Sequence, residues 1–229
     1  MKKTGSIFLA LFFANLFLFA QDQELIFVKA GTSLMDQFTV SERYLYPEFT
    51  NGLIFFRFNT YSERKFNYNY LNGEIEYLQG SDTLAIANEE DIKLIAIEED
   101  TFYYNDAYVK QIRSGDPKVG VRDFLELKEV QKKDPYGVSS SGSSRISYNA
   151  LPNDGNLYKL RGDHDMIFQR TRQYYLSTPW SGFLLFTRKN VMLLYPGNKK
   201  QIKSYLKTNK TKFDTEEDLF RLADYLGTL

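Results

Sequence analysis

The sequence predicts an α+β fold in which an antiparallel β meander is followed by a C-terminal cluster of short helices. Aromatic residues make up 16% of the 229 residues, and they favour the half-buried surface of a sheet. Between about residues 53 and 130, hydrophobic residues recur with a period close to two, and turn residues interrupt them roughly every eight to twelve positions. After residue 182 the period lengthens toward that of a helix. The meander is compatible with a curled sheet, a sandwich or an open barrel.

The first twenty residues have the layout of a secretory signal peptide. Lys2 and Lys3 precede an apolar stretch that ends at Ala20, and the chain then becomes polar. This stretch is shorter than the roughly 20 residues that cross a bilayer as a helix. We expect cleavage after Ala20 and a periplasmic or secreted protein. An uncleaved anchor is the alternative, because Leu18 is larger than the small residue usual at that position.

The clearest element of the meander is a hairpin around Asn72-Gly73, a pair that tolerates the positive φ of a tight turn. Apolar and polar residues alternate on both sides of this turn, so we expect one face to be buried and the other to be wet. The expected buried face carries Phe66, Tyr68, Tyr70, Ile75 and Tyr77, and the expected wet face carries Asn67, Asn69, Glu74 and Glu76.

Further short strands are expected on both sides of a flexible loop over 132–156, where Ser, Gly, Pro and Asp accumulate. We expect the strands after the loop to complete the same sheet. The expected strands are 53–58, 83–87, 92–97, 101–104, 108–112 and 119–130 before the loop, and 157–160 and 166–176 after it.

Three short helices are expected at the C-terminus. The first begins with Phe183 and stops before Pro196-Gly197, and the second covers 199–207. The third begins at Asp214 or Thr215, and Asp214 has the spacing of a capping box with Glu217.

Gly227 is well placed to end the third helix. The expected organisation is therefore a signal peptide over 1–20, a β-rich domain over 21–178, and a helical segment over 179–229 that packs on the sheet.

Several segments resemble one family of exported, uncharacterised proteins of Gram-negative bacteria. They are YPEFTNG at 46–52, FNYNYLNGEI at 66–75, GSDTLAI at 80–86 and RKNVMLLYP at 188–196, with IKSYL at 202–206 and DL at 218–219. The resemblance implies export and a similar fold. It implies no activity and no site residue.

Composition excludes several kinds of chemistry. The 29 basic and 29 acidic residues balance, so nothing favours nucleic acid as a partner. Without cysteine and with a single histidine, the chain cannot form disulfides, a thiolate nucleophile, a thiolate zinc site or a multi-histidine metal centre. Phosphate-loop and dinucleotide-binding motifs are missing. We therefore expect no catalytic, cofactor-binding or metal-binding residues and no cofactor.

The single histidine, His164, lies between Asp163 and Asp165. It could act as a general base or, with both acids, bind a cation. In an extended segment the two carboxylates would point away from the imidazole, which favours a polar turn instead.

Glycoside hydrolysis needs only two carboxylates and leaves no short motif. Tyr68, Tyr70, Tyr103 and Tyr104 could form a sugar platform, although such tyrosines more commonly belong to the core and rim of a sheet. Most acids lie in runs at turns and at a helix start, where solvated charges are expected.

Lysines accumulate between residues 199 and 212 without an acid. Lys199, Lys203 and Lys207 would lie on one face of the second helix and could attract an anionic membrane surface, or they could form an ordinary solvated face. The preferred interpretation is an exported, non-enzymatic binding or interaction module of the envelope, with an envelope protein or a glycan as partner. The alternative is a glycan-binding or glycan-hydrolysing protein.

Overall fold

The computed structural model describes residues 25–31, 37–131 and 165–229. The strands are β1 (Leu25–Val28), β2 (Thr50–Phe56), β3 (Tyr61–Asn69), β4 (Glu74–Gln79), β5 (Asp82–Ala85), β6 (Ile92–Ile97), β7 (Asp100–Tyr104), β8 (Tyr108–Arg113), β9 (Lys118–Gln131), β10 (Asp165–Ser177) and β11 (Leu184–Leu185). The helices are α2 (Val40–Arg43), α3 (Arg188–Leu194), α4 (Lys199–Asn209) and α5 (Glu216–Leu226), with 3₁₀ turns η1 (Glu89–Asp91) and η3 (Pro196–Asn198).

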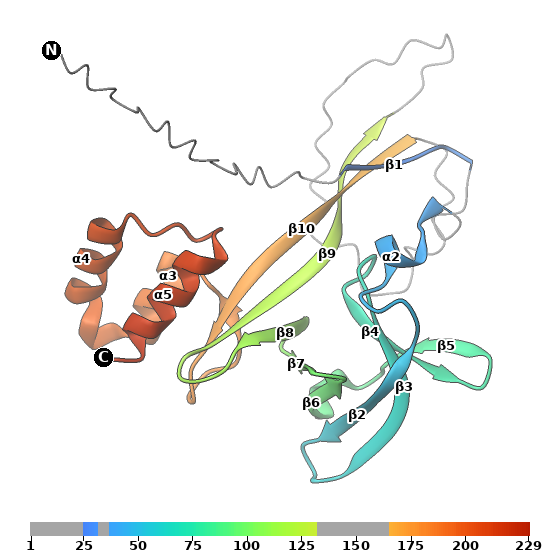
Figure 1. The fold of residues 1–229 in the computed structure, drawn as a ribbon, viewed down its shortest axis with the longest axis horizontal. Coiled ribbons are helices and arrows are strands. Elements are labelled where there is room, and N and C mark those ends of the chain that lie inside the picture. Colours follow the sequence, from blue (N-terminus) through green and yellow to red (C-terminus); the bar gives the residue numbers. More distant parts are fainter. Residues whose placement is uncertain (1–24, 32–36, 132–164) are drawn as a thin grey trace, which may run out of the picture.

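Within the described residues, eleven strands form one antiparallel sheet (Figure 1). The order across it is β1-β10-β9-β8-β7-β6-β2-β3-β4-β5, and β11 pairs with the end of β10. Helices α3, α4 and α5 follow. The predicted α+β fold is therefore confirmed, with the meander as a curled sheet that does not close. The strands expected between 53 and 130 and over 166–176 are present, whereas β1 and α2 were not predicted.

The sheet curls because the end of β3 reaches the middle of β9, although four strands separate them in the sheet order. The Leu125 N–H donates to the Tyr70 carbonyl at 2.7 Å, and the Tyr68 hydroxyl donates to the Asp123 carbonyl at 2.8 Å. These contacts enclose a first hydrophobic core. It consists of Val28, Phe38, Ile54, Phe66, Tyr68, Tyr70, Leu71, Ile75, Ile92, Ile95, Ile97, Phe102, Tyr108, Leu125, Met166 and Phe168.

The long β9–β10 ribbon contributes one face to two different cores. Val121 and Leu125 are four residues apart on β9 and pair regularly with β10, so their side chains point to the same side. Leu125 nonetheless packs inside the curled sheet, whereas Val121 packs beneath the C-terminal helices. The right-handed twist of a two-stranded ribbon, which is stronger than that of a wide sheet, turns the face from one core to the other.

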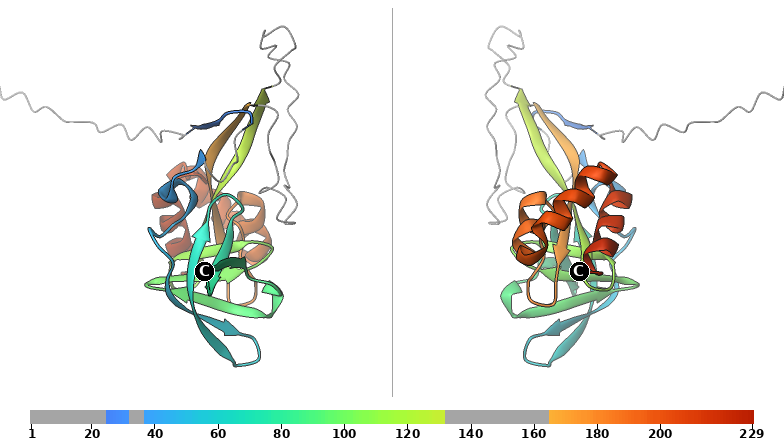
Figure 2. Two further views of the ribbon diagram at one scale, coloured as in Figure 1. Left: turned by 90° about the vertical axis from the view of Figure 1, so that its right-hand side faces the viewer. Right: turned by 90° about the vertical axis from the view of Figure 1, so that its left-hand side faces the viewer.

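Helices α3, α4 and α5 cover the end of the ribbon that carries β11 (Figures 1 and 2). Their apolar stripes bury a second core against β9 and β10. This core consists of Val119, Val121, Tyr174, Leu176, Phe186, Val191, Ile202, Leu206, Leu219, Leu222, Ala223 and Leu226.

The hairpin predicted around Asn72-Gly73 is formed by β3 and β4, but the expectation that its polar face is wet is wrong. Asn67 and Asn69 are completely buried, and Glu76 is 4% exposed. The segment around Tyr46 covers this face. Asn67 donates from Nδ2 to the Tyr46 carbonyl at 2.9 Å and accepts the Tyr46 N–H on Oδ1 at 3.1 Å. Asn67 therefore hydrogen-bonds both backbone groups of Tyr46, which lies in an irregular segment and has no strand partner there.

The buried Glu76 carboxylate is held by a small polar network. The Tyr44 hydroxyl and Asn69 Nδ2 each donate to it at 2.8 Å, and an Arg43 nitrogen lies 3.9 Å away. Burial, together with the hydrogen bond to Glu76, raises the pKa of Tyr44. The network ties the segment before β2 onto the hairpin, so its role is structural.

The helix expected from Phe183 begins only at Arg188, because the apolar run before it pairs with β10. β11 forms first, and the Phe186 N–H then donates to the Tyr174 carbonyl at 2.7 Å. Thr187 is the N-cap of α3, and its hydroxyl accepts an N–H from the first turn at 3.3 Å.

The second helix is present as α4, two residues longer than expected, and the third is α5. The capping box expected from Asp214 is wrong. The N-cap is Thr215, whose side chain makes no capping hydrogen bond, and Glu217 forms an ion pair with Arg221 instead. Gly227 does end the helix, in a right-handed rather than a left-handed conformation.

Four expectations lie outside the described residues. They are the signal peptide over 1–20, the loop over 132–156, the strand over 157–160 and the site around His164.

Replacing Asn67 should destabilise the fold strongly. Asn67→Ala removes both hydrogen bonds to Tyr46 and leaves buried backbone groups without partners, so the free energy of unfolding should fall by roughly 2–4 kcal/mol. Urea denaturation measures the change. Asn51→Ala, at an exposed position on β2, is the control and should change stability little. Equal effects of the two substitutions would contradict the assigned role.

Glu74 should make stability depend on pH. Burial, with smaller contributions from Glu89 and Glu76, raises the pKa of Glu74 to about 7. Its folded pKa exceeds its unfolded value of about 4.5, so the folded state loses stability as pH rises through this window. Glu74→Gln should therefore raise the melting temperature at pH 8 more than at pH 4.5. A gain that is the same at both pH values would refute this assignment.

Candidate functional site

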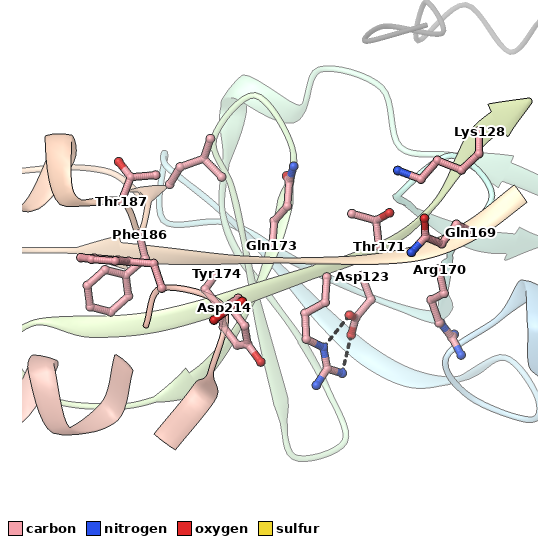
Figure 3. A pocket seen from close by; sticks show the side chains of 13 residues that line it. Asp123, Lys128, Gln169, Arg170, Thr171, Gln173, Tyr174, Phe186, Thr187 and Asp214 are labelled. Carbon is pink, nitrogen blue, oxygen red and sulfur yellow. Dashed lines mark hydrogen bonds and ion pairs between the residues drawn. The ribbon is translucent and has the colours of Figure 1, made fainter. Parts of the chain in front are cut away.

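A surface groove of about 680 Å³ lies beside residues 169–174 of β10 (Figure 3). Gln169, Thr171 and Gln173 point to one side of the strand, and Arg170 points to the other (Figure 3). This alternation is that of any strand, so the polar groups do not converge on one point. The groove follows the edge of β10.

The strongest ion pair of the groove joins Arg172 of β10 to Asp123 of β9. The guanidinium donates from Nε and Nη2 to the two carboxylate oxygens at 2.7 and 2.9 Å. These hydrogen bonds raise the pKa of Arg172. A Glu216 oxygen of α5 lies 3.8 Å from Arg172 and also accepts from the Tyr174 hydroxyl at 3.3 Å. Asp123 is therefore engaged, and the groove offers no free pair of carboxylates of the kind that glycoside hydrolysis uses.

The second hollow is a pocket of about 440 Å³ that three cations line: Arg57 after β2, Lys93 of β6 and Lys118 of β9. No aspartate or glutamate is among the described residues that line it. Glu90 and Asp91 contact Arg57 through their backbone carbonyls, which accept its Nε–H and N–H at 2.7 and 2.8 Å. The pocket, referred to below as the cationic pocket, is suited to an anion.

Ser177, Thr178 and Ser181 also line the cationic pocket. They are ordered by a tight turn, in which the Ser181 N–H donates to the Thr178 carbonyl at 3.1 Å and the Ser181 hydroxyl accepts the Thr178 N–H at 3.1 Å. Ser177 donates to the Ser181 carbonyl at 3.0 Å. The Ser177 hydroxyl hydrogen is used in that bond, and the Thr178 and Ser181 hydroxyls hydrogen-bond to each other at 3.0 Å. One of the latter two therefore keeps its hydrogen as a donor for an oxyanion beside the cations.

Phe183 anchors this turn to the sheet. Its ring packs on Tyr103 at 5.4 Å between centroids, and its carbonyl accepts from Asn105 Nδ2 at 2.8 Å. Gly120 makes room for the ring, since a Cβ there would lie 2.8 Å from it. The pocket wall is therefore fixed by buried packing.

Two of the four tyrosines singled out in the sequence, Tyr103 and Tyr104, line the cationic pocket. The Lys118 ammonium donates to the Tyr103 hydroxyl at 3.1 Å and lies 4.7 Å from its ring centre. Burial raises the pKa of Tyr104, so its phenol stays neutral. Tyr68 and Tyr70 instead belong to the first core and cannot serve as a platform.

The three lysines of the second helix, Lys199, Lys203 and Lys207, are exposed on α4. The opposite face of α4 is buried through Ile202 and Leu206, as expected. These lysines lie outside the cationic pocket.

Sequence reasoning did not identify Arg57, Lys93 and Lys118. They come from three separate turns and strands, and no spacing in the sequence links them. The Pro179-Trp180-Ser181-Gly182 run indicated a turn in the sequence, but nothing in it indicated that this turn borders a pocket lined by cations.

No helix in the described ranges has the length and apolar character needed to cross a membrane. Among the same residues, no group of three or more His, Asp or Glu side chains is arranged to hold a metal ion. Comparison of the chain with protein-family models, characterised proteins and solved structures finds no match.

Proposed function

We propose that the protein is an exported, non-enzymatic module of the cell envelope that docks on anionic membrane headgroups through the cationic pocket. The observation that carries the proposal is the convergence of Arg57, Lys93 and Lys118 with ordered hydroxyls in a hollow whose described lining has no carboxylate. Export rests on the predicted signal peptide and on the family resemblance, both of which remain expectations.

Two exposed aromatic side chains beside the pocket favour a membrane surface as the partner. Trp180 is 91% exposed and Phe58 is 79% exposed, the highest values among large hydrophobic residues in the described ranges. Arg57, which precedes Phe58, lines the pocket, as do Pro179 and Ser181 on either side of Trp180. Aromatic side chains next to cations are the usual anchors of proteins at the membrane interface.

Both aromatic residues are held by tight turns. The Asn59 N–H donates to the Phe56 carbonyl at 3.2 Å, and the Ser181 N–H donates to the Thr178 carbonyl at 3.1 Å. Phe58 and Trp180 each precede the donor residue, at the tip of the turn. Both turns border the cationic pocket, because Arg57 beside Phe58 and Pro179 with Ser181 beside Trp180 line it. The two tips can therefore approach one surface together.

A membrane explains these features better than a glycan or the lysines of α4. A sugar platform lies flat against a groove, whereas Trp180 projects into solvent with almost no contact to the protein. Lys199, Lys203 and Lys207 provide charge, but the apolar side of α4 is buried in the second core and cannot enter lipid. Glycan binding keeps one supporting observation, the presence of Tyr103 and Tyr104 in the pocket.

Vesicle binding should be visible in the fluorescence of Trp180, the only tryptophan of the chain. Vesicles that contain phosphatidylglycerol should shift its emission to the blue, and brominated lipids should quench it. Phosphatidylcholine vesicles should do neither. Lys93→Gln with Lys118→Gln should weaken binding about fivefold for each cation removed, because each contributes about 1 kcal/mol near an anionic surface. Added salt should weaken binding as well.

Two control variants test whether vesicle binding depends on the cationic pocket and its neighbouring aromatic residues rather than on any exposed charge or apolar side chain. Lys203→Gln with Lys207→Gln removes the same charge from α4, and Leu193→Ala removes an exposed apolar side chain from α3. Both should bind vesicles like the wild type, whereas Phe58→Ala should bind more weakly. Every variant keeps the native N-terminal region, so differences report the described surface. Loss of binding in the α4 variant alone would overturn the proposal.

An experiment with inorganic phosphate distinguishes anion binding in the cationic pocket from docking on a membrane. If phosphate shifts the Trp180 indole N–H signal in NMR spectra but vesicles leave its fluorescence unchanged, membrane docking is wrong and a soluble anionic ligand such as a charged glycan remains. If neither probe has an effect, the cationic pocket is not the binding site.

A further inference from the structure

The surroundings of Glu74, the first residue of β4, disfavour a negative charge on its carboxyl group. Its side chain is partly buried, and the charged groups that act on it are Glu89 of η1, Glu76 of β4 and Arg122 of β9. Burial and the two carboxylates oppose its ionisation more strongly than Arg122 favours it. A neutral amide completes the surroundings, since Asn72 Nδ2 donates to a Glu74 carboxyl oxygen at 3.2 Å. Glu74 therefore keeps its proton up to neutral pH.

The 3₁₀ turn η1 connects this carboxyl group to the cationic pocket. Its first residue, Glu89, is the acid whose charge acts most strongly on Glu74. The next two residues hold Arg57 of the pocket. The Glu90 carbonyl accepts the Arg57 Nε–H at 2.7 Å, and the Asp91 carbonyl accepts the Arg57 backbone N–H at 2.8 Å. One turn of three residues thus fixes a cation of the pocket and places a carboxylate within electrostatic reach of Glu74.

Two tyrosines form a second connection between Glu74 and the pocket. Tyr104 lines the pocket, and its ring packs edge-on against that of Tyr108 at 5.1 Å between centroids. Burial raises the pKa of both hydroxyls, and the charges of Glu89 and Glu74 raise it further. Because Tyr108 is 2% exposed, water does little to screen these charges. The electrostatic field of Glu74 therefore reaches a side chain of the pocket wall.

The protonation state of Glu74 changes the electrostatic potential in the cationic pocket. Below about pH 7 the carboxyl group is neutral, and the positive charges of Arg57, Lys93 and Lys118 dominate. Above this pH Glu74 is ionised, and its charge adds to that of Glu89 and opposes a bound anion. Affinity for an anion should therefore fall as the pH rises through neutrality. By linkage, a bound anion should raise the pKa of Glu74.

We infer that Glu74 is a proton-dependent regulator of the cationic pocket, which binds an anionic headgroup more tightly when Glu74 is protonated than when it is ionised. This inference rests on the proposed function of the pocket. An anionic membrane attracts protons as it attracts other cations, so Glu74 is more fully protonated at such a surface than in bulk solution. Docking and protonation therefore reinforce each other.

Sulfate binding tests this regulation, because the charge of sulfate is constant across neutral pH whereas that of phosphate changes. The Trp180 indole N–H signal in NMR spectra measures binding at constant ionic strength. The wild type should bind sulfate roughly threefold more tightly at pH 5.5 than at pH 8, the order of effect expected of one nearby charge that is partly screened. Glu74→Gln should bind sulfate equally at both pH values, with the affinity of the protonated wild type.

Two variants control for other groups. His164 is the single histidine and titrates in the same range, and Glu63 is an exposed acid of β3. His164→Gln and Glu63→Gln should both keep the pH dependence of the wild type. Loss of that dependence in His164→Gln, or its persistence in Glu74→Gln, would overturn the inference and leave the proposed function intact. A wild type that binds sulfate without pH dependence would do the same. A sulfate signal missing at both pH values would overturn the proposed function, and the inference with it.

The reciprocal effect gives a second readout, which a purely structural role of Glu74 would not produce. In carbon-13 NMR spectra, saturating sulfate should raise the pKa of the Glu74 carboxyl group by about the logarithm of the affinity ratio. Glu89→Gln should lower this pKa, because it removes the charge that acts most strongly on Glu74, and should move the sulfate transition to lower pH. If bound sulfate leaves the pKa of Glu74 unchanged, the inference is wrong.

Discussion

The structure depends on the twist of the β9–β10 ribbon. One face of this ribbon is buried at both ends, in a different hydrophobic core at each end. Tyr174 and Leu176 bury it under the helices, and Met166 and Phe168 bury it inside the curled sheet. The stretch between them is polar and lies where the twist turns the face from one core to the other. Its ion pair, Asp123 with Arg172, satisfies charges that neither core could accept.

The same ribbon also helps to form the cationic pocket, because Lys118 of β9 and Ser177 of β10 line it. At its helical end, the turn that presents Trp180 is fixed by Phe183, which packs on the sheet over Gly120.

Local patterns in the sequence were sufficient for the fold class and for most elements, because periodicity is set by the nearest neighbours along the chain. They failed where distant segments decide the environment. Asn67 is polar and central to a hairpin, yet it is buried because the Tyr46 segment lies over it. The apolar run from Phe183 was assigned to a helix from its local pattern, but pairing with β10 made part of it a strand. The cationic pocket was beyond prediction for the same reason, since its cations are brought together only by the curl of the sheet.

The shared ribbon has a further consequence for how the molecule comes apart. If the helices detached, Tyr174 and Leu176 would lose their cover, and the ribbon would be free to untwist. Untwisting would in turn swing Leu125 and Phe168 out of the curled sheet and break the hydrogen bond to Tyr70. Strand and helix therefore have little opportunity to melt separately, and heat or denaturant should disassemble both cores in a single cooperative transition.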